Sequence, residues 1–237
     1  MVLGIESSAI TASCAVCEDG RIIAEQFLNT AHTHSETLLP MVRDMLRGAG
    51  LTLSDMESVA VTAGPGSFTG LRIGISCVKG MCSGAGIPCV SVSTLEAIAQ
   101  NFRGFDGTVC ACMDARRKQV YNALFKSENG VITRLCEDRA ISIEELFAEV
   151  SCPDFTNGGK LYIAGDGAEL AFTEFGTLND GEPFGELAPI ALRYQRGSGV
   201  CFAAEGKPQI SPEELMPGYL RIPQAERERN QKNPETT

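Results

Sequence analysis

The stretch SVAVTAGPGSFTGLRIG, residues 58–74, decides how this chain folds. Residues 58–63 are mostly apolar or β-branched and predict a buried strand, residues 64–70 form a glycine-rich loop, and a helix is expected over 71–85. A strand, a glycine loop and a helix in this order predict an α/β fold, in which helices pack on a sheet.

The glycine-rich loop allows two interpretations. A loop that joins a strand to a helix N-terminus presents free backbone N–H groups, which bind phosphate in many proteins. The spacing Gly64-x-Gly66-x3-Gly70 is one residue longer than the dinucleotide fingerprint, and no Lys-Ser/Thr pair follows as in a P-loop. The alternative is a tight turn, in which Gly66 supplies the backbone angles and Gly70 allows close helix packing. The residues alone leave both interpretations open.

The residues before this stretch predict a β-meander followed by a helix. Strands are expected over 2–5, 11–17 and 21–28, with the turn Glu18-Asp19-Gly20 between the last two. Apolar residues from Leu38 to Leu46 then follow helical spacing and form a wide stripe. Pro40 falls inside this pattern, so the helix begins later or its first turn is distorted.

The residues after it predict a second lobe. A strand over 87–92 and a helix over 94–101 complete an alternation of strands and helices. New strands over 108–114 and 119–125 then predict a second strand hairpin like the one at the N-terminus. We therefore expect two related lobes, 1–101 and 102–207. A C-terminal segment of about 208–225 is expected to pack back on the first lobe, and 226–237 form a polar tail.

Composition narrows the possible functions. The 237 residues are 43% hydrophobic and carry 20 basic and 30 acidic side chains, for a net charge of −10, which disfavours autonomous binding of nucleic acid or anionic lipid. The N-terminus has no basic signal region and no window approaches about 18 uninterrupted apolar residues, so we expect a soluble cytoplasmic protein without membrane contact.

No metal site is expected. The ten cysteines lie mostly in apolar, strand-like settings and are predicted to be reduced thiols. Cys14-x2-Cys17 is the only zinc-like spacing, whereas a closed zinc site needs four ligands and the chain has only His32 and His34, in a predicted exposed loop. No Ser/His/Asp or Cys/His arrangement indicates nucleophilic catalysis.

Two helices are candidates for a partner surface. The helix over 71–85 carries small and apolar residues at steps of three and four, which allow another helix to approach closely, and the preceding helix has its wide stripe. The alternative is that the second lobe covers both helices. The candidate interface residues are Leu38, Val42, Met45, Gly70, Gly74, Cys77 and Met81.

The opening strand ends in Glu6, Ser7 and Ser8, which place a carboxylate and two hydroxyls at a turn. Such a turn can face a phosphate or the water shell of Mg2+, and with Gly64 and Gly66 it forms a possible vestigial nucleotide site. The alternative is an ordinary capped hairpin turn.

Several blocks, spread in order over nearly the whole chain, closely resemble the TsaB family, also called YeaZ. These blocks are LGIESS (3–8), HSE with LLP (34–40), AGPGSFTGLRIG (63–74), DARR (114–117) and PGYLR (217–221), with GDGA (165–168) in the otherwise loosely matched middle. The resemblance implies a two-lobed fold of the actin, sugar kinase and Hsp70 (ASKHA) type, each lobe a mixed sheet with helices.

The resemblance also implies a function. The family supplies a noncatalytic subunit of the bacterial machinery that places a threonylcarbamoyl group on N6 of adenosine 37 (t6A) in tRNAs reading ANN codons. Its paralogue TsaD performs the transfer with a metal held by two histidines, and those positions correspond here to Thr94 and Ile98, with Glu96 between them. TsaB proteins usually carry Asp where Glu6 stands.

The expected partners follow from this resemblance. The two helices would pack on the equivalent pair of TsaD, or on a second copy of this chain when TsaD is absent, and the ATPase TsaE joins the complex. ATP, Mg2+ or another metal would be used by the assembly and not bound by this chain alone. Because tRNA would reach the chain only indirectly, the isolated chain is expected to show no salt-sensitive tRNA binding.

Two other functions stay open. An ATP-dependent enzyme of the sugar-kinase type would use residues 64–70 and 6–8 on phosphates, with Gly165-Asp166-Gly167 as its second-lobe element. A protease acting on TsaD has no metal or nucleophile set to support it. The roles of Asp114, Arg116 and Arg117 are either functional or those of a salt-bridged turn.

Overall fold

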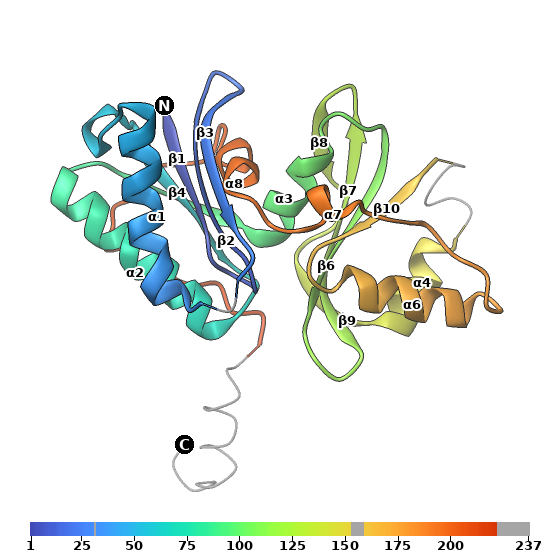
Figure 1. The fold of residues 1–237 in the computed structure, drawn as a ribbon. Coiled ribbons are helices and arrows are strands. Elements are labelled where there is room, and N and C mark those ends of the chain that lie inside the picture. Colours follow the sequence, from blue (N-terminus) through green and yellow to red (C-terminus); the bar gives the residue numbers. More distant parts are fainter. Residues whose placement is uncertain (31, 153–158, 222–237) are drawn as a thin grey trace, which may run out of the picture.

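Two lobes, each built on a mixed β-sheet, lie side by side in the computed structural model (Figure 1). The structure describes residues 1–30, 32–152 and 159–221. The expected polar tail 226–237, and residues 222–225 of the expected C-terminal segment, lie outside these residues. The expected α/β architecture is confirmed.

The first sheet contains the predicted meander and the strand that opens the deciding stretch. β1, β2 and β3 pair antiparallel, whereas β4 and β5 run parallel to β1. In spatial order the strands are β3 (Arg21–Leu28), β2 (Ala12–Glu18), β1 (Val2–Glu6), β4 (Ser58–Gly64) and β5 (Cys89–Ser93). β1 and β4 are central and buried on both faces, which explains their continuous apolar sequences.

The second sheet repeats this arrangement. β6 pairs antiparallel with β7 and parallel with β10, so β6 has the position that β1 has in the first sheet. In spatial order the strands are β11 (Glu186–Leu187), β10 (Leu161–Ala164), β6 (Gly107–Asp114), β7 (Gln119–Glu128) and β8 (Val131–Arg134), and β9 (Arg139–Ser142) also pairs with β7. The prediction of two related lobes is therefore confirmed by strand order.

Helices cover both faces of each sheet. α1 and α2 pack on the outer face of the first sheet, and α4 and α6 on the outer face of the second. α3 lies between the lobes and contacts strands of both. The helices are α1 (His34–Ala49), α2 (Phe68–Ala85), α3 (Thr94–Ala99), α4 (Ile143–Val150), α6 (Ala168–Leu178), α7 (Ile190–Arg193) and α8 (Gly197–Ala203), with 3-10 turns η1 (Leu53–Asp55) and η2 (Gln100–Phe102).

The start of α1 differs from both expectations about Pro40. The helix begins before the proline, at His34, and contains Pro40 as its seventh residue. Proline has no N–H, so it makes no hydrogen bond to the carbonyl four residues earlier. The buried residues Leu38, Val42 and Met45 anchor the helix to the sheet, and this packing tolerates the missing bond.

The chain returns to the first lobe at α8. This helix packs against β1 and β2, although its residues belong to the range 102–207 that we expected to form the second lobe. The following segment stays on the first lobe, where Ile210 bridges Cys89 and Leu215 is fully buried in the core. Its last described residues then reach the second lobe through Arg221, whose guanidinium donates to the Ala115 carbonyl oxygen.

The cysteines are all free, and seven of the ten are buried. Cys14 packs under α1 with its sulfur 3.5 Å from that of Met45, while Cys17 lies on the other face of the sheet beside Cys201. The two thiols of the zinc-like spacing therefore cannot bind one metal ion together.

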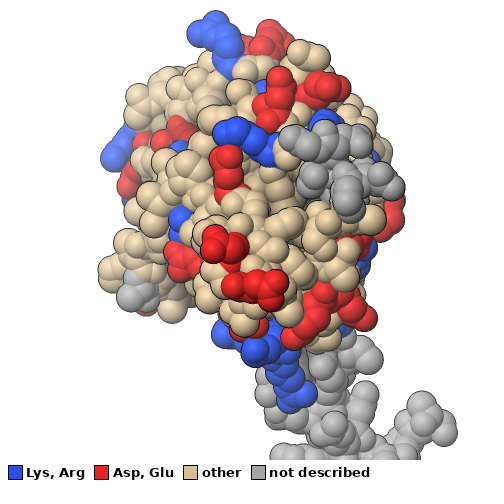
Figure 2. Space-filling view, turned by 90° about the vertical axis from the view of Figure 1, so that its right-hand side faces the viewer, with Lys and Arg blue, Asp and Glu red and all other residues tan. Residues whose placement is uncertain are grey.

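Two further properties concern the surface. Acidic side chains spread over the outer face of the second lobe, and Lys and Arg side chains gather at its lower end (Figure 2). Within the described residues, no helix combines the length and the apolar character needed to cross a membrane.

Candidate functional site

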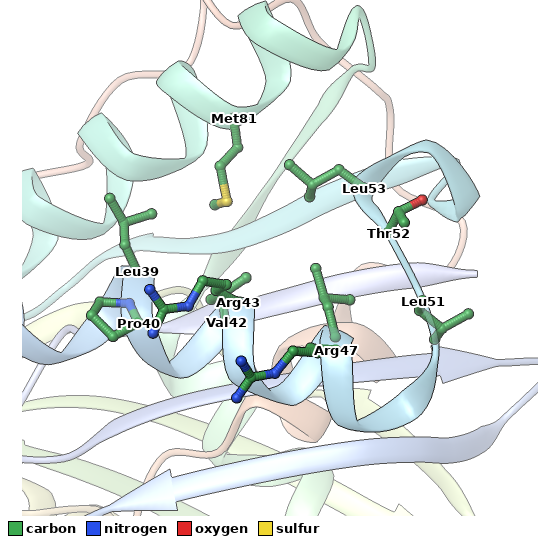
Figure 3. A pocket seen from close by; sticks show the side chains of 10 residues that line it. Leu39, Pro40, Val42, Arg43, Arg47, Leu51, Thr52, Leu53 and Met81 are labelled. Carbon is green, nitrogen blue, oxygen red and sulfur yellow. The ribbon is translucent and has the colours of Figure 1, made fainter.

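An apolar groove separates α1 from α2 on the outer face of the first lobe (Figure 3). It has a volume of about 670 Å³, and Met81 points into it from α2 toward Leu39 and Pro40 of α1. The lining residues are Leu39, Pro40, Val42, Arg43, Leu46, Arg47, Leu51, Thr52, Leu53 and Met81. α1 and α2 lie on the side of the first sheet that faces away from the second lobe, which leaves the groove open (Figure 1).

The exposed lining is apolar in the middle and basic at the side. Leu39 is 47% exposed and is not an isolated apolar residue, because Pro40 and Met81 line the same groove and form one apolar patch with it. Arg43 and Arg47 extend along α1 next to it and pair with Asp44 at 3.0 and 3.5 Å, in exposed positions. The groove thus combines an uncovered apolar floor with a positively charged edge.

The predicted interface residues divide into three groups in the structure. Leu38, Val42 and Met45 are buried under α1 in the core of the first lobe, although Val42 also reaches the groove. Gly70 and Gly74 face inward, where an added Cβ would overlap atoms of Ser7. Cys77 and Met81 are partly exposed on α2. Of the seven residues, Val42 and Met81 line the groove.

Sequence reasoning missed the outer residues of the same helices. Leu39, Arg43 and Arg47 are four residues apart and so share one face of α1, a spacing that was available in the sequence. On α2 the open small residues are Gly80 and Gly84, because an added Cβ there would meet nothing within 4 Å. The small-residue stripe at Gly70 and Gly74 was thus assigned to the wrong face.

The glycine-rich loop is filled by the chain's own atoms. The Ser67 N–H donates to the Ser8 carbonyl oxygen at 2.6 Å, and a Cβ on Gly66 would lie 2.5 Å from that oxygen. The Ser67 hydroxyl caps α2 by accepting from the Gly70 N–H at 3.3 Å. Two of the backbone donors of this loop, the N–H groups of Ser67 and Gly70, therefore already have partners within the chain.

The individual glycines have roles that differ from the tight-turn hypothesis. Gly64, and not Gly66, has the positive φ of 139°, and it packs against Gly218, whose N–H donates to the Ala63 carbonyl oxygen at 2.7 Å. Gly66 is required for the close approach of Ser8. Gly70 allows the helix to pack closely on Ser7, as that hypothesis stated.

Glu6 lies beneath this turn and is fully buried. Its Oε1 accepts hydrogen bonds from the N–H and the hydroxyl of Ser8, both at 2.5 Å, while Oε2 has no partner among the described residues. Burial raises the pKa of Glu6 to about 7, against the lowering effect of the Ser8 hydrogen bonds. Ser7 turns away from Glu6 and donates to the Gly70 carbonyl oxygen at 2.9 Å.

A second, partly buried carboxyl comes from the other lobe. Asp166 follows β10, receives a hydrogen bond from Gln195 at 3.0 Å, and has its pKa raised mainly by burial. Its charge also raises the pKa of Glu6, so the two groups are close enough to interact. Two carboxyls repel a phosphate unless a cation lies between them. The described residues contain no group of three or more His, Cys, Asp or Glu side chains arranged to hold a metal ion.

The two positions that we expected to correspond to the TsaD histidines lie on α3. Thr94 and Ile98 are both fully buried between the lobes, and the hydroxyl of Thr94 has no hydrogen-bond partner within the described residues. Glu96 forms ion pairs with Arg134 at 3.3 Å and Lys207 at 3.0 Å. The hydrocarbon side chain of Ile98 cannot ligate a metal, and the Glu96 carboxylate is already neutralised by its two ion pairs.

His34 is a helix residue and not the loop residue that we expected. It begins α1, and its Nε2 lies 2.7 Å from the Ala9 carbonyl oxygen. His32 is exposed outside any helix or strand.

Asp114 and Arg116 form a salt-bridged turn at the end of β6. The Asp114 carboxylate accepts the Arg116 backbone N–H at 2.7 Å and pairs with its guanidinium at 3.2 Å. Arg117 is exposed beside them.

Fold and groove together define the class of the protein. It is a two-lobed protein of the actin, sugar kinase and Hsp70 type, with equivalent strand orders in both lobes and an uncovered helical face on the first. A family model described as "TsaD: tRNA N6-adenosine threonylcarbamoyltransferase" matches residues 21–174.

Relatives and a solved structure give the family within this class. The tRNA threonylcarbamoyladenosine biosynthesis protein TsaB of Escherichia coli is 39% identical over 93% of this chain and 94% of its own length. TsaB of Bacillus subtilis is 29% identical over 95% and 96%. The structure of YeaZ from Pseudomonas aeruginosa superimposes with a TM-score of 0.74 at 26% identity, covering 92% of this chain and 99% of that one. The chain belongs to the TsaB (YeaZ) family.

Proposed function

We propose that this chain is a noncatalytic subunit in the biosynthesis of t6A at position 37 of tRNAs reading ANN codons. It binds the transferase TsaD through the α1–α2 groove, acts together with the ATPase TsaE, and forms a homodimer through the same groove when TsaD is absent. ATP and a metal such as Mg2+ are used by the assembled complex. The observation that carries this proposal is the open apolar groove on a helical face that the second lobe leaves uncovered.

The groove has the composition of an interface centre. Leu39 and Met81 project from opposite walls, and a partner side chain placed between them would be removed from water on both sides. The few residues that contribute most of the binding free energy of an interface cluster at its centre, in well-packed pockets from which water is excluded. Arg43 and Arg47 at the edge favour a partner with carboxylates nearby.

The outer face of α2 permits close helix packing. Ser76, Gly80 and Gly84 are four residues apart, and the two glycines have no neighbouring atoms where a Cβ would be. A partner helix can therefore approach the α2 backbone more closely than larger side chains would allow. A pair of helices from TsaD, or from a second copy, fits such a surface.

Two features support the noncatalytic part of the proposal. Thr94 and Ile98 replace the metal-binding histidines of TsaD and are buried, so no metal-bound reaction centre can form there in the same way. In the loop at residues 64–70 the N–H groups of Ser67 and Gly70 are engaged by Ser8 and Ser67 and the Cβ position of Gly66 is filled by Ser8, which argues against the kinase-type alternative.

The test is association with TsaD. We expect Leu39→Glu and Met81→Glu to weaken the complex with TsaD at least about thirtyfold each, because each puts a charge into an apolar interface centre and a hot spot contributes about 2 kcal/mol or more. Dissociation constants from calorimetry measure this directly. Gly74→Arg is unsuitable, because Gly74 faces Ser7 inside the lobe and the variant would damage the fold.

The matched control is Val131→Glu. Val131 lies on β8 of the second lobe and is 61% exposed, so this change adds the same charge at an exposed apolar residue away from the groove. Val131→Glu should leave the affinity unchanged. Equal affinities for TsaD among all three variants and the unaltered chain would show that the groove is not part of the interface. Sedimentation of the same variants without TsaD tests whether the homodimer uses the groove.

A further inference from the structure

The turn between β6 and β7 has an unusual backbone. Arg116, Arg117 and Lys118 have φ values of 68°, 56° and 55°, so three consecutive residues with side chains are in the left-handed region. This region is disfavoured for such residues, because their Cβ comes too close to the following carbonyl oxygen. Strain of this kind persists only where the surroundings fix it, and it concentrates at functional sites.

The surroundings fix this turn from several directions. The Ala115 N–H donates to the Gln119 carbonyl oxygen at 3.0 Å, and the Ile143 N–H donates to the Lys118 carbonyl oxygen at 3.2 Å. Arg221 donates to the Ala115 carbonyl oxygen at 3.0 Å and to the Gln119 side chain. These contacts fix the backbone of the turn, and so the positions from which its three basic side chains extend.

These side chains point mainly into solvent. The Arg116 side chain is 87% exposed and pairs with Asp114, and the Lys118 side chain is 64% exposed and pairs with Glu174 at 3.1 Å. Arg117 is exposed and forms no ion pair with any residue that the structure describes. The turn is thus a local cluster of positive charge on a chain whose net charge is negative. It lies at the lower end of the second lobe, where Lys and Arg gather in Figure 2.

The C-terminal segment extends this positive surface to the first lobe. The Arg72 guanidinium stacks on the Phe68 ring, with its carbon 3.8 Å from the ring centroid, and its Nε donates to the Tyr219 hydroxyl at 3.0 Å. The Tyr219 ring packs on the Phe68 ring, with 5.2 Å between their centroids. Two residues later Arg221 lies over the Tyr121 ring at 5.7 Å. We call Arg72, Arg116, Arg117, Lys118 and Arg221 the basic rim.

We propose that the basic rim binds the phosphate backbone of RNA, with the strained turn Ala115–Lys118 at its centre. The inference rests on the proposed function, in which RNA is the substrate of the assembly. Guanidinium groups that alternate with half-exposed aromatic rings suit unpaired RNA, because arginine pairs with phosphate and flat groups stack on bases. An acidic protein surface would use the same charges without the rings.

The net charge limits the strength of this contact. The chain as a whole carries −10, and because we expected tRNA to reach it only indirectly we predicted no salt-sensitive tRNA binding by the isolated chain. The rim departs from that prediction, since it offers a local site for about three phosphates. Three phosphate contacts would weaken about 20- to 40-fold between 50 and 200 mM salt. The rim thus adds to RNA affinity inside the assembly and is measurable on the isolated chain at low salt.

The experiment is a titration of the full chain into fluorescently labelled, unmodified tRNA, followed by anisotropy from 25 to 200 mM NaCl. The unaltered chain should bind at the lowest salt and lose affinity as salt rises. Arg116→Glu/Arg117→Glu should bind at least tenfold more weakly at 25 mM and should flatten the salt dependence by about two phosphate contacts. Arg117→Glu alone, which breaks no ion pair, should give part of this loss, and Arg117→Lys should restore most of it.

The matched control is Arg21→Glu/Lys160→Glu. These cations make the same change in net charge but begin β3 and precede β10, at the ends of the sheets opposite the rim. The control should bind RNA within about twofold of the unaltered chain. Equal losses in both double variants, or no binding at 25 mM salt, would overturn the proposal.

Two more measurements distinguish an RNA site on the rim from a nucleotide site and from the TsaD interface. In the first, ATP with Mg2+ is added at a concentration equal to that of the RNA phosphate groups. Displacement of the RNA by ATP would mean that the rim is a nucleotide site, and would overturn the RNA proposal. The Arg116→Glu/Arg117→Glu variant should keep its affinity for TsaD, so a failure of the groove and a failure of the rim give different results.

Discussion

Glu6 shows how burial changes the chemistry of a single residue. The sequence presents a carboxylate beside two hydroxyls, which matches a phosphate or magnesium turn equally well as a capped hairpin. In the folded chain the carboxyl is enclosed, its neighbours Ser7 and Ser8 are engaged with Gly70 and with Glu6 itself, and its pKa is about 7. The turn is therefore part of the folded core, and the Glu6 carboxyl within it is partly protonated near pH 7.

This pKa makes stability depend on pH. A carboxyl whose pKa is raised in the folded state binds its proton more tightly there, so its contribution is most favourable below the unfolded pKa of 4.5 and is lost as the pH rises to about 7. Replacing Glu6 by Gln removes this loss. We expect the free energy of unfolding of Glu6→Gln, relative to the unaltered chain, to increase by about 2 kcal/mol between pH 5 and pH 8.

Urea denaturation at the two pH values measures this difference. Glu144→Gln, at an exposed position in the first turn of α4, is the control and should show the same difference at both pH values. A flat difference for Glu6→Gln as well would mean that Glu6 ionises normally in the folded chain.

Helix α2 shows that the fold decides which side of a helix faces inward. Its glycines and small residues are visible in the sequence, and their four-residue spacing predicts stripes of close packing. The spacing does not say which stripe faces the lobe. The fold answers this, because Gly70 and Gly74 lie against Ser7 and leave Gly80 and Gly84 on the open side.

The two sides of α2 should respond oppositely to one added methyl group. Gly70→Ala would place a Cβ against the Ser7 carbonyl oxygen and should destabilise the chain by about 1–3 kcal/mol. Gly80→Ala meets no atom and should stabilise it by about 0.5–1 kcal/mol through helix propensity. Thermal and urea unfolding of both variants check this, and similar effects at both positions would contradict the assignment of inner and outer faces.

At the scale of the whole molecule, the C-terminal segment joins the two lobes. Gly218 binds Ala63, Tyr219 packs on Phe68, and Arg221 reaches the turn at Ala115 in the second lobe. The PGYLR block, which the sequence shows only as part of the family resemblance, is thus a physical connection between the lobes.

Removing the Arg221 side chain should loosen this connection. Hydrogen bonds from a charged donor contribute about 1.5–3 kcal/mol when partly buried, so Arg221→Ala should lower the unfolding free energy by about 1–3 kcal/mol. Amide exchange at Gln119 and neighbouring residues of the turn should accelerate. Arg47→Ala, whose side chain is 79% exposed, should change stability by less than about 0.5 kcal/mol, and equal effects of the two variants would argue against the connection.

The sequence by itself determined the order and type of most elements, since hydrophobic period and glycine punctuation are local properties of the chain. It also determined the family, because specific blocks such as residues 63–74 are read without coordinates. It could not place the helix start before Pro40, because packing of Leu38 and Met45 outweighs the local cost of a proline.

Only the tertiary structure decided which residues line the open groove. Leu38 and Leu39 are neighbours of equal hydrophobicity, yet one is fully buried and the other is 47% exposed at the groove. The α8 helix belongs to the first lobe for the same kind of reason, since its small residues fit closely against β1 and β2. Contacts between segments far apart in the chain set these outcomes, and a one-dimensional pattern does not contain them.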